Sequence, residues 1–506
     1  MPLATRPSAD VSAVFEKAIA ALNEPDSFLP LDEVDSALSR APGDFRLWQV
    51  KGLIHRRQEQ RGLAIPALRR AAELAPDDAL VVHGYARTLF EAGLPSVEQY
   101  ACALKLAPAN PDIVKGLAAA LVAEGRVADA IAGIETVIWR SPLWTDGHRL
   151  LADLRWANGE RRGFTRSFDA AIRAHPNSLE LRREQLDALL HGERLNDALE
   201  RIRDGTKRFG RHPLFIAFEA AVCSERGDVE EADRLFRELA PFADANSDIR
   251  HVRHLLRSGQ AELSIPIIDK WLDSPERHLF WPSASAAWRL TGDPRSEWLE
   301  GDERLVGIYD IEDQLPPLDE VAGILRKLHQ FPGQPLAQSV RGGSQTDGNL
   351  FERIEPEIVA LREALRQAVA RHTERLPRFD PAHPLEQDRP KNIRFSGAWS
   401  VCLRGGGTHT NHVHPQGWLS SALYIALPPT IEPDEQQGWL KLGEPDAALG
   451  LDLPPRRLVE PRPGRLALFP SWMWHGTRPF AAGERLTVAF DVAGAGYGAP
   501  HRLSKN

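Results

Sequence analysis

Three histidines near the C-terminus have a spacing that could bind a metal ion. His412 and His414 are one residue apart at the end of a predicted strand, 409–414, and His475 ends a later apolar run. Alternate residues of a strand point to the same face, so the first two imidazoles can enter one cavity. Imidazole nitrogens suit Fe(II), and three ligands on one octahedral face leave positions free. We therefore predict a metal site on His412, His414 and His475. Strand alternation sends His409 to the opposite face.

An arginine follows these histidines at a distance that suits a bound carboxylate. Arg485 stands ten residues after His475, and Thr487 lies on the same face of the same predicted strand. A guanidinium can hold a carboxylate with two hydrogen bonds, and a threonine hydroxyl can add a third. Tyr424 could reach the same carboxylate or could simply pack inward. We predict that catalysis depends on the three histidines and Arg485, with an α-keto acid and O₂ in the free positions.

Short strands must position these residues. Candidates lie at 395–403, 409–414, 419–426, 439–442, 465–469, 472–477 and 485–492, each bounded by glycine or proline. Two helical segments, 318–329 and 354–375, precede them. Six or more short strands after supporting helices predict an α+β double-stranded β-helix, or jelly roll, which opens a pocket between its sheets.

The first three hundred residues contain a repeat. Prolines recur at steps of 34, 32, 34, 34, 37, 28 and 34 residues, and the segments between them read as two amphipathic helices with a short turn. Such hairpins stack into a solenoid because each one needs neighbours to bury its apolar face. We predict a helical solenoid over 10–295 and the jelly-roll domain over 296–506. Pro66, inside one of the helices, is expected to kink it. The prolines are Pro42, Pro76, Pro108, Pro142, Pro176, Pro213, Pro241 and Pro275.

Composition restricts the classes of function. The 506 residues carry a net charge of -8, which gives no general attraction to nucleic acid or to an anionic membrane. The N-terminus lacks the pattern of an export signal, and no apolar run is long enough to span a bilayer. Three widely spaced cysteines, Cys102, Cys223 and Cys402, favour neither a disulfide framework nor a cysteine zinc site. We expect a cytoplasmic protein that binds neither nucleic acid nor membranes.

Two family resemblances follow from these patterns. The repeat resembles the tetratricopeptide repeat, which implies a protein or peptide partner in the groove of the solenoid. Residues 300–506 resemble the 2-oxoglutarate/Fe(II) oxygenases with the prolyl-hydroxylase jelly roll, especially the group with an HxHP segment. That resemblance implies that His412 and His475 bind iron and that Arg485 anchors the 5-carboxylate of 2-oxoglutarate. The matching segments are QSVRGGSQT at 338–346, HVHPQGWLSS at 412–421, PGRLALFPS at 463–471 and ERLTVAFD at 484–491.

The chain departs from the wider superfamily at one ligand. Most such oxygenases have Asp or Glu where this chain has His414, so the iron has either three histidine ligands or two histidines and water. The resemblances imply an oxygenase that hydroxylates a protein or peptide recruited by the solenoid, with Fe(II) and 2-oxoglutarate as cofactors and O₂ as co-substrate. One alternative is an interaction scaffold with a catalytically degenerate jelly roll. Another is a zinc or iron isomerase, or a dioxygenase without 2-oxoglutarate.

Overall fold

The computed structural model describes residues 9–24, 27–242, 244–329, 336, 338–429 and 435–495. Contacts divide the chain into two compact units. The first contains residues 1–139, 348–359 and 496–506, and the second contains residues 140–347 and 360–495. This division falls within the helical repeat, so the boundary that the sequence predicts between residues 295 and 296 stays a prediction.

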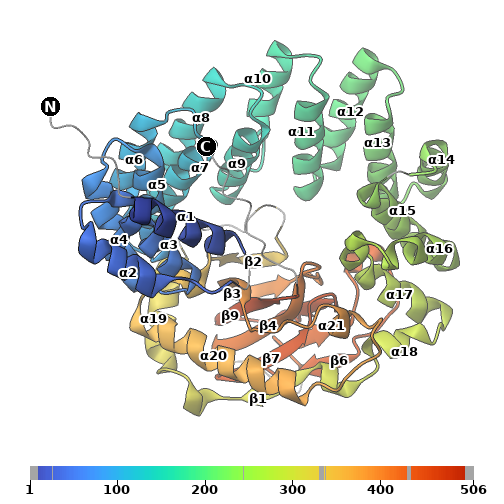
Figure 1. Cartoon of the computed structure of the whole chain (residues 1–506). Helices are drawn as coiled ribbons and strands as arrows, with labels where there is room; N and C mark the ends of the chain where they lie inside the picture. The colour runs from blue at the N-terminus through green and yellow to red at the C-terminus, as the bar shows by residue number, and fades with distance from the viewer. Residues whose placement is uncertain are drawn as a thin grey trace. The chain divides into compact units, whose positions relative to one another are not determined.

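The helices of the first unit form consecutive hairpins at the blue end of the chain (Figure 1). They are α1 (Ala9–Asn23), α2 (Leu31–Arg40), α3 (Phe45–Arg57), α4 (Arg61–Leu74), α5 (Ala79–Glu91), α6 (Val97–Leu106), α7 (Pro111–Ala123) and most of α8 (Val127–Arg140). A β-carbon on Gly52 of α3 would overlap the Leu68 side chain of α4, so the two helices approach closely. Helix α4 continues through Pro66, and the proline therefore does not end it.

The second unit continues the hairpins with α9 (Thr145–Ala157), α10 (Arg166–Ala174), α11 (Leu179–His191), α12 (Leu195–Phe209), α13 (Pro213–Arg226), α14 (Val229–Leu239), α15 (Ala245–Arg257), α16 (Ala261–Leu272), α17 (Trp281–Thr291) and α18 (Arg295–Glu300). The predicted helical repeat is confirmed.

The repeated prolines precede residues that start helices. Four of these prolines are followed, two residues later, by a short polar residue. Its side chain accepts a hydrogen bond from a backbone N–H of the next helix, and these residues are Asp44, Asp78, Asn110 and Ser178. The first four N–H groups of a helix have no partner within it, so such caps stabilise the helix start. The repeated turn therefore both ends one helix and caps the next.

Two antiparallel sheets follow the helices, as the jelly-roll prediction requires. The larger sheet has the order β1 (Gly307–Asp310), β7 (Arg465–Pro470), β4 (Gly417–Ala426), β9 (Glu484–Ala493), β3 (Phe395–His409) and β2 (Val340–Gln345). The smaller sheet has the order β6 (Arg457–Val459), β5 (Leu440–Leu442) and β8 (His475–Thr477). Helices α19 (Leu318–Leu328), α20 (Pro356–Arg375) and α21 (Pro384–Gln387) complete the domain.

The strand prediction is wrong for one segment and omits three short strands. The segment 409–414 is not a strand of its own: β3 ends at His409, and His412 forms an isolated bridge with His475. The short strands β1, β2 and β6 were not predicted, because a few residues at a sheet edge show little alternation. In β2, Gly342 has a φ of 68°, and a β-carbon on Gly343 would overlap the backbone of β3.

Within the second unit, the last helices of the repeat pack on the sheets. Trp474 Nε1 donates a hydrogen bond of 2.9 Å to the carbonyl of Pro282 on α17, and Arg456 lies 3.3 Å from the buried Glu300 of α18. Trp418 and Trp472 are also buried. The three tryptophans therefore pack in the interior. The contacts of Trp474 and Arg456 hold α17 and α18 against the jelly roll.

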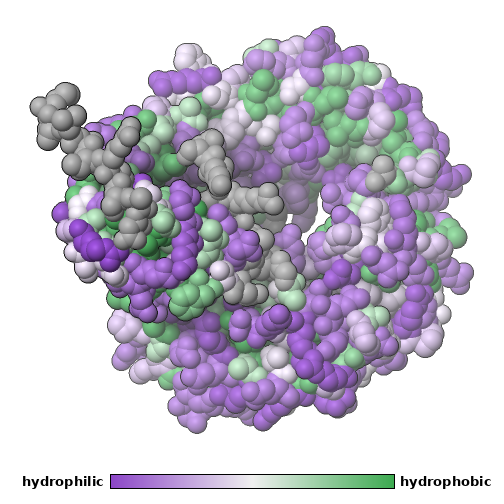
Figure 2. All heavy atoms as spheres, in the orientation of Figure 1, coloured by the Kyte–Doolittle hydropathy of each residue, from purple (hydrophilic) through white to green (hydrophobic). Residues whose placement is uncertain are grey.

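None of the described helices has the length and apolar character that a membrane span requires. Hydrophilic residues predominate on the face that Figure 2 shows.

Buried His372 should make stability depend on pH. Its Nδ1 lies 2.9 Å from the Tyr309 hydroxyl, and burial lowers its pKa to about 4. The unfolded chain, with a histidine pKa of 6.5, binds a proton that the folded chain does not, so stability should fall as pH drops below that value. At pH 7.5 we expect His372→Asn to lower the free energy of unfolding by about 1–2 kcal/mol. Urea unfolding at pH 7.5 and 5 should show this deficit shrinking at the lower pH; a constant deficit would contradict the argument.

Candidate metal and carboxylate site

The structure brings the three predicted histidines together. Their ligand nitrogens all lie within 4.8 Å of one another. The backbones of His412 and His475 exchange two hydrogen bonds of 2.9 Å, and the N–H of His414 donates to the carbonyl of Ser471 at 2.9 Å. Pairing between two distant segments therefore positions the imidazoles, in place of the continuous strand that the sequence predicts.

Each imidazole presents the same nitrogen to the space between them. The Nδ1 of His412 lies 2.8 Å from the carbonyl of Thr410, and the Nδ1 of His475 lies 2.9 Å from that of Met473. The Nδ1 of His414 lies 2.7 Å from Asp491 Oδ2. A ring nitrogen that donates to an oxygen keeps its hydrogen, which leaves Nε2 with a free lone pair. Three Nε2 atoms are thus candidate ligands, that of His412 with the Ser339 hydroxyl 3.2 Å away, and this donor set fits Fe(II).

Burial keeps two of these histidines neutral. It lowers the pKa of His412 to about 3, with the charge of His414 adding to the effect. Burial and the neighbouring His412 also lower the pKa of His475 well below its usual value. Metal binding requires the neutral imidazole, so protons compete little with a metal here at neutral pH.

His409 lies beside the cluster, and the prediction that it faces away is wrong. Its ring is stacked on that of His412, with centroids 5.5 Å apart. The Ser339 hydroxyl lies 2.9 Å from His409 Nδ1 and 3.2 Å from His412 Nε2. Strand alternation fails because the chain leaves the regular strand after His409. His409 is not among the three residues whose ligand atoms converge.

A carboxylate that the sequence reasoning missed supports His414. Asp491 on β9 holds His414 through Oδ2 and accepts a 2.6 Å hydrogen bond from the Ser420 hydroxyl at Oδ1. A carboxylate behind a histidine ligand fixes the ring and makes it a stronger donor. The alternation of β9 could have indicated this role, because Arg485, Thr487 and Asp491 all stand on one face of the strand.

Arg485 forms a second subsite that is suited to an anion. Its side chain is 2% exposed, and no salt bridge to it occurs among the described residues. Arg485 Cζ lies 4.9 Å from the Tyr424 ring centroid. In the described part of the chain, neither Arg485 Nε nor the Tyr424 hydroxyl has a hydrogen-bond partner. Burial lowers the pKa of Arg485, and the Tyr424 hydroxyl opposes this effect. A buried cation that no carboxylate of the described residues neutralises is costly, so the pair fits a bound carboxylate.

Strand β9 connects the two subsites. Thr487 pairs with Tyr424 of β4 and with Val401 of β3, and its hydroxyl lies 3.5 Å from the Val401 carbonyl. Between Thr487 and Asp491 on this face stands Ala489, a small and partly exposed residue.

Comparison with known families agrees with this geometry. Residues 397–491 match the family model described as "Putative 2OG-Fe(II) oxygenase". This segment of the chain is therefore similar to that oxygenase family, and it follows a series of helical hairpins. The matched residues contain the three histidines, Arg485 and Asp491.

Solved structures resemble each half only distantly. A tetratricopeptide repeat protein from Parabacteroides merdae is 15% identical, with a TM-score of 0.30 over 47% of this chain and 94% of that one. A Pseudomonas putida prolyl-4-hydroxylase is 16% identical, with a TM-score of 0.25 over 37% of this chain and 92% of that one. No curated protein matches the chain. The family match and the site geometry therefore carry the functional argument.

Substitution of single histidines should separate ligands from neighbours. We expect His412→Ala and His475→Ala each to weaken Fe(II) binding by at least about 100-fold, because each removes one of the converging nitrogens. His409→Ala is the matched control, since it removes a neighbouring ring that is outside the cluster. Anaerobic Fe(II) titration would measure the affinities. Equal losses in all three variants would mean that the assignment of ligands is wrong.

Asp491 should act through His414. We expect Asp491→Asn to lower Fe(II) affinity by roughly 10–100-fold, because the amide holds the imidazole less strongly. Ser420→Ala removes only the hydroxyl behind the carboxylate and should have a smaller effect. The same titration, with thermal unfolding of the metal-free variants, would test this. Unchanged affinity in Asp491→Asn would exclude a role for Asp491 at the metal.

Proposed function

We propose that the chain is an Fe(II)- and 2-oxoglutarate-dependent oxygenase that hydroxylates a protein or peptide recruited by the helical repeat. One observation carries the proposal. Three imidazole nitrogens converge within 4.8 Å, and the buried Arg485, which has no salt bridge among the described residues, lies on the same strand as the carboxylate that holds His414. A structural core needs neither a histidine cluster nor an uncompensated guanidinium.

Two separate groups of residues would bind the metal and the carboxylate. His412, His414 and His475 would hold the iron, and Arg485, Tyr424 and Thr487 would hold the distal carboxylate of 2-oxoglutarate. When bound, these two groups supply an oxidation of a C–H bond by O₂, with succinate and CO₂ as co-products. The contacts of the three Nδ1 atoms keep the imidazoles oriented.

A second candidate function is an interaction scaffold with a degenerate jelly roll. A histidine in place of the usual carboxylate favours that reading. The 2.7 Å contact between His414 and Asp491 supports the enzyme instead, since it orients the ring for a ligand and places a negative charge next to the site.

The proposed partner and location rest on the repeat and the cysteines. Stacked hairpins give the chain an extended surface for a polypeptide. All three cysteines are free, which fits a reducing compartment such as the cytoplasm.

Loss of Arg485 should abolish use of 2-oxoglutarate while leaving the metal site. We expect the wild type, loaded with Fe(II), to release succinate slowly even without a protein substrate. Arg485→Ala should raise the 2-oxoglutarate concentration needed for half-maximal turnover by at least about 100-fold, because it removes the only buried cation of the subsite. Succinate measurement and Fe(II) titration would follow the two sites separately.

Arg404→Ala is the matched control, because it removes an exposed arginine from the neighbouring strand β3. Its turnover should equal that of the wild type. Absence of both Fe(II) binding and succinate release in the wild type would reject the oxygenase and favour the scaffold.

A further inference from the structure

The hydroxyl of Ser339 lies next to a nitrogen that would bind the metal. Its Oγ is 3.2 Å from His412 Nε2 and 2.9 Å from His409 Nδ1. Because His412 Nδ1 contacts the Thr410 carbonyl at 2.8 Å, Nε2 is the ring nitrogen that is left for a metal. The oxygen of Ser339 therefore belongs to the immediate surroundings of any metal that His412 holds.

The distance between these two atoms suits a pair of ligands. In an octahedral site with metal–ligand bonds of about 2.1 Å, two neighbouring ligand atoms are about 3.0 Å apart. The separation of Ser339 Oγ and His412 Nε2 is 3.2 Å, which is close to that value. A hydroxyl oxygen has two lone pairs, so it can bind a metal while its hydrogen is donated elsewhere.

His409 supplies an acceptor for that hydrogen. A neutral imidazole has one nitrogen that accepts a hydrogen bond, and Nδ1 of His409 lies 2.9 Å from Ser339 Oγ. Once a metal occupies His412 Nε2, the hydroxyl can donate to His409 and direct its lone pairs to the metal. His409 would then be a positioning residue that holds a ligand without being one.

The other two candidate ligands have no such neighbour. Among the described residues, no hydrogen bond involves Nε2 of His414 or Nε2 of His475, whose Nδ1 atoms make the contacts given above. In that part of the chain, Ser339 is thus the polar side chain that contacts a nitrogen of the cluster on its metal side.

The main chain of Ser339 is fixed beside the cluster. Its carbonyl accepts hydrogen bonds from the Thr410 N–H at 2.9 Å and from the Thr410 hydroxyl at 3.3 Å. The next residue, Val340, begins β2 and pairs with His409 of β3. The hydroxyl is therefore held near His412 by the same segment that carries the histidines.

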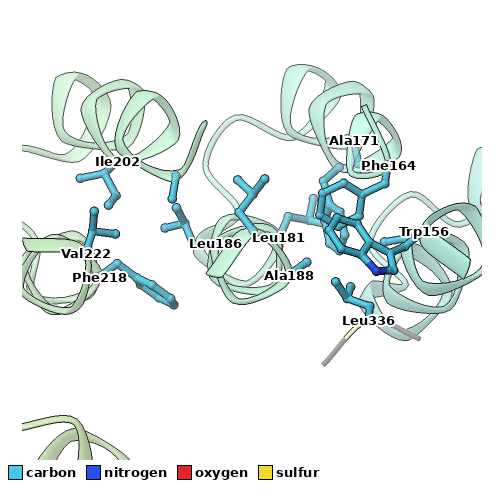
Figure 3. Close-up of a cluster of buried hydrophobic side chains, with 14 of the residues drawn as sticks. Trp156, Phe164, Ala171, Leu181, Leu186, Ala188, Ile202, Phe218, Val222 and Leu336 are labelled. Atoms are coloured by element: carbon cyan, nitrogen blue, oxygen red, sulfur yellow. The ribbon is translucent and has the colours of Figure 1, made fainter. Parts of the chain in front are cut away.

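The chain before Ser339 is anchored in the helices. Leu336 packs into the helical core beside Trp156 and Ala188 (Figure 3). Gln338 lines a cavity of about 1000 Å³ that is formed mainly by helices α9, α11, α13 and α15. Displacement of this short segment by a ligand of the helices would withdraw Ser339 from the metal.

A fourth ligand changes how many positions remain free. An octahedral metal has six positions, and three histidines with Ser339 would fill four of them. An α-keto acid that binds through two oxygen atoms would take the other two. O₂ could then bind only after the hydroxyl has left.

We propose that Ser339 is a displaceable fourth ligand of the metal, positioned by His409, and that it occupies the place that O₂ needs. The ligand role rests on the proposed metal site, and the role toward O₂ rests on the proposed oxygenase function.

A cysteine in place of Ser339 gives the most direct test of the contact. Co(II) binds imidazole sites and absorbs visible light, and a thiol that coordinates a metal loses its proton. We expect full-length Ser339→Cys with Co(II) to show a sulfur-to-metal charge-transfer band in the near ultraviolet. Ser421→Cys is the matched control, because the Ser421 hydroxyl donates to the Phe490 carbonyl at 2.9 Å and takes no part in the cluster. Its spectrum should lack the band.

Removal of the hydroxyl gives a second measurement. Ser339→Ala should weaken Co(II) binding by about 3–10-fold, because it deletes one weak oxygen ligand. It should also change the visible spectrum of the bound Co(II). His409→Ala should cause a similar small loss of affinity, far below that of His412→Ala. Thermal unfolding of each metal-free variant would show that the fold is intact.

Succinate release without a protein substrate tests the effect on O₂. With Fe(II) bound, Ser339→Ala should release succinate about 3–10-fold faster than the wild type, because the competent state no longer requires displacement of the hydroxyl. A rate equal to that of the wild type would overturn the role toward O₂.

The outcomes separate this inference from the proposed function. Co(II) binding by the wild type, together with a Ser339→Cys spectrum that lacks the charge-transfer band, would overturn the fourth ligand and leave the histidine site standing. Such a band without succinate release by the wild type would reject the oxygenase and keep Ser339 as a ligand. A wild type that binds no Co(II) would overturn both.

Discussion

The proposed metal site depends on two backbone hydrogen bonds between His412 and His475. These residues lie in separate segments, and the exchange of N–H and carbonyl groups at 2.9 Å fixes the spacing of their side chains. His475 begins β8 of the smaller sheet, and the segment with His412 follows β3 of the larger one. The bridge therefore joins the two sheets at the point where the imidazoles meet. Without it, the histidines would have no common cavity.

Electrostatics of the pocket follow from its burial. The interior disfavours charge, which keeps His412 and His475 neutral, whereas the cation of Arg485 has the Tyr424 hydroxyl beside it and no salt bridge among the described residues. Asp491 supplies a negative charge at the opposite end of β9. A dianion with carboxylates at its two ends would compensate both the arginine and a divalent metal. Most oxygenases of this kind have a carboxylate where this chain has His414. Here the carboxylate of Asp491 instead contacts that histidine from behind.

The second unit joins the helical repeat and the oxygenase-like domain into one structure. Trp474 and Arg456 hold the last helices against the sheets, and Leu336 fills a gap in the helical core. Ser339 then contacts the site only three residues later. The segment that contains Leu336 and Ser339 thus connects the helical core to the histidine cluster.

The sequence by itself determined the helical repeat and the jelly roll, and its residue types and spacing predicted the three histidines. Regular proline spacing and the alternation of β9 are local properties, so they identified the helical hairpins and the shared face of Arg485 and Thr487. Only the tertiary structure decided which distant residues touch. His414 and Asp491 are 77 residues apart, and Ser339 and His412 are 73 apart. The register of the sheets sets those contacts, and register depends on the packing of the whole domain. The stacked position of His409 and the support from Asp491 could not be predicted for that reason.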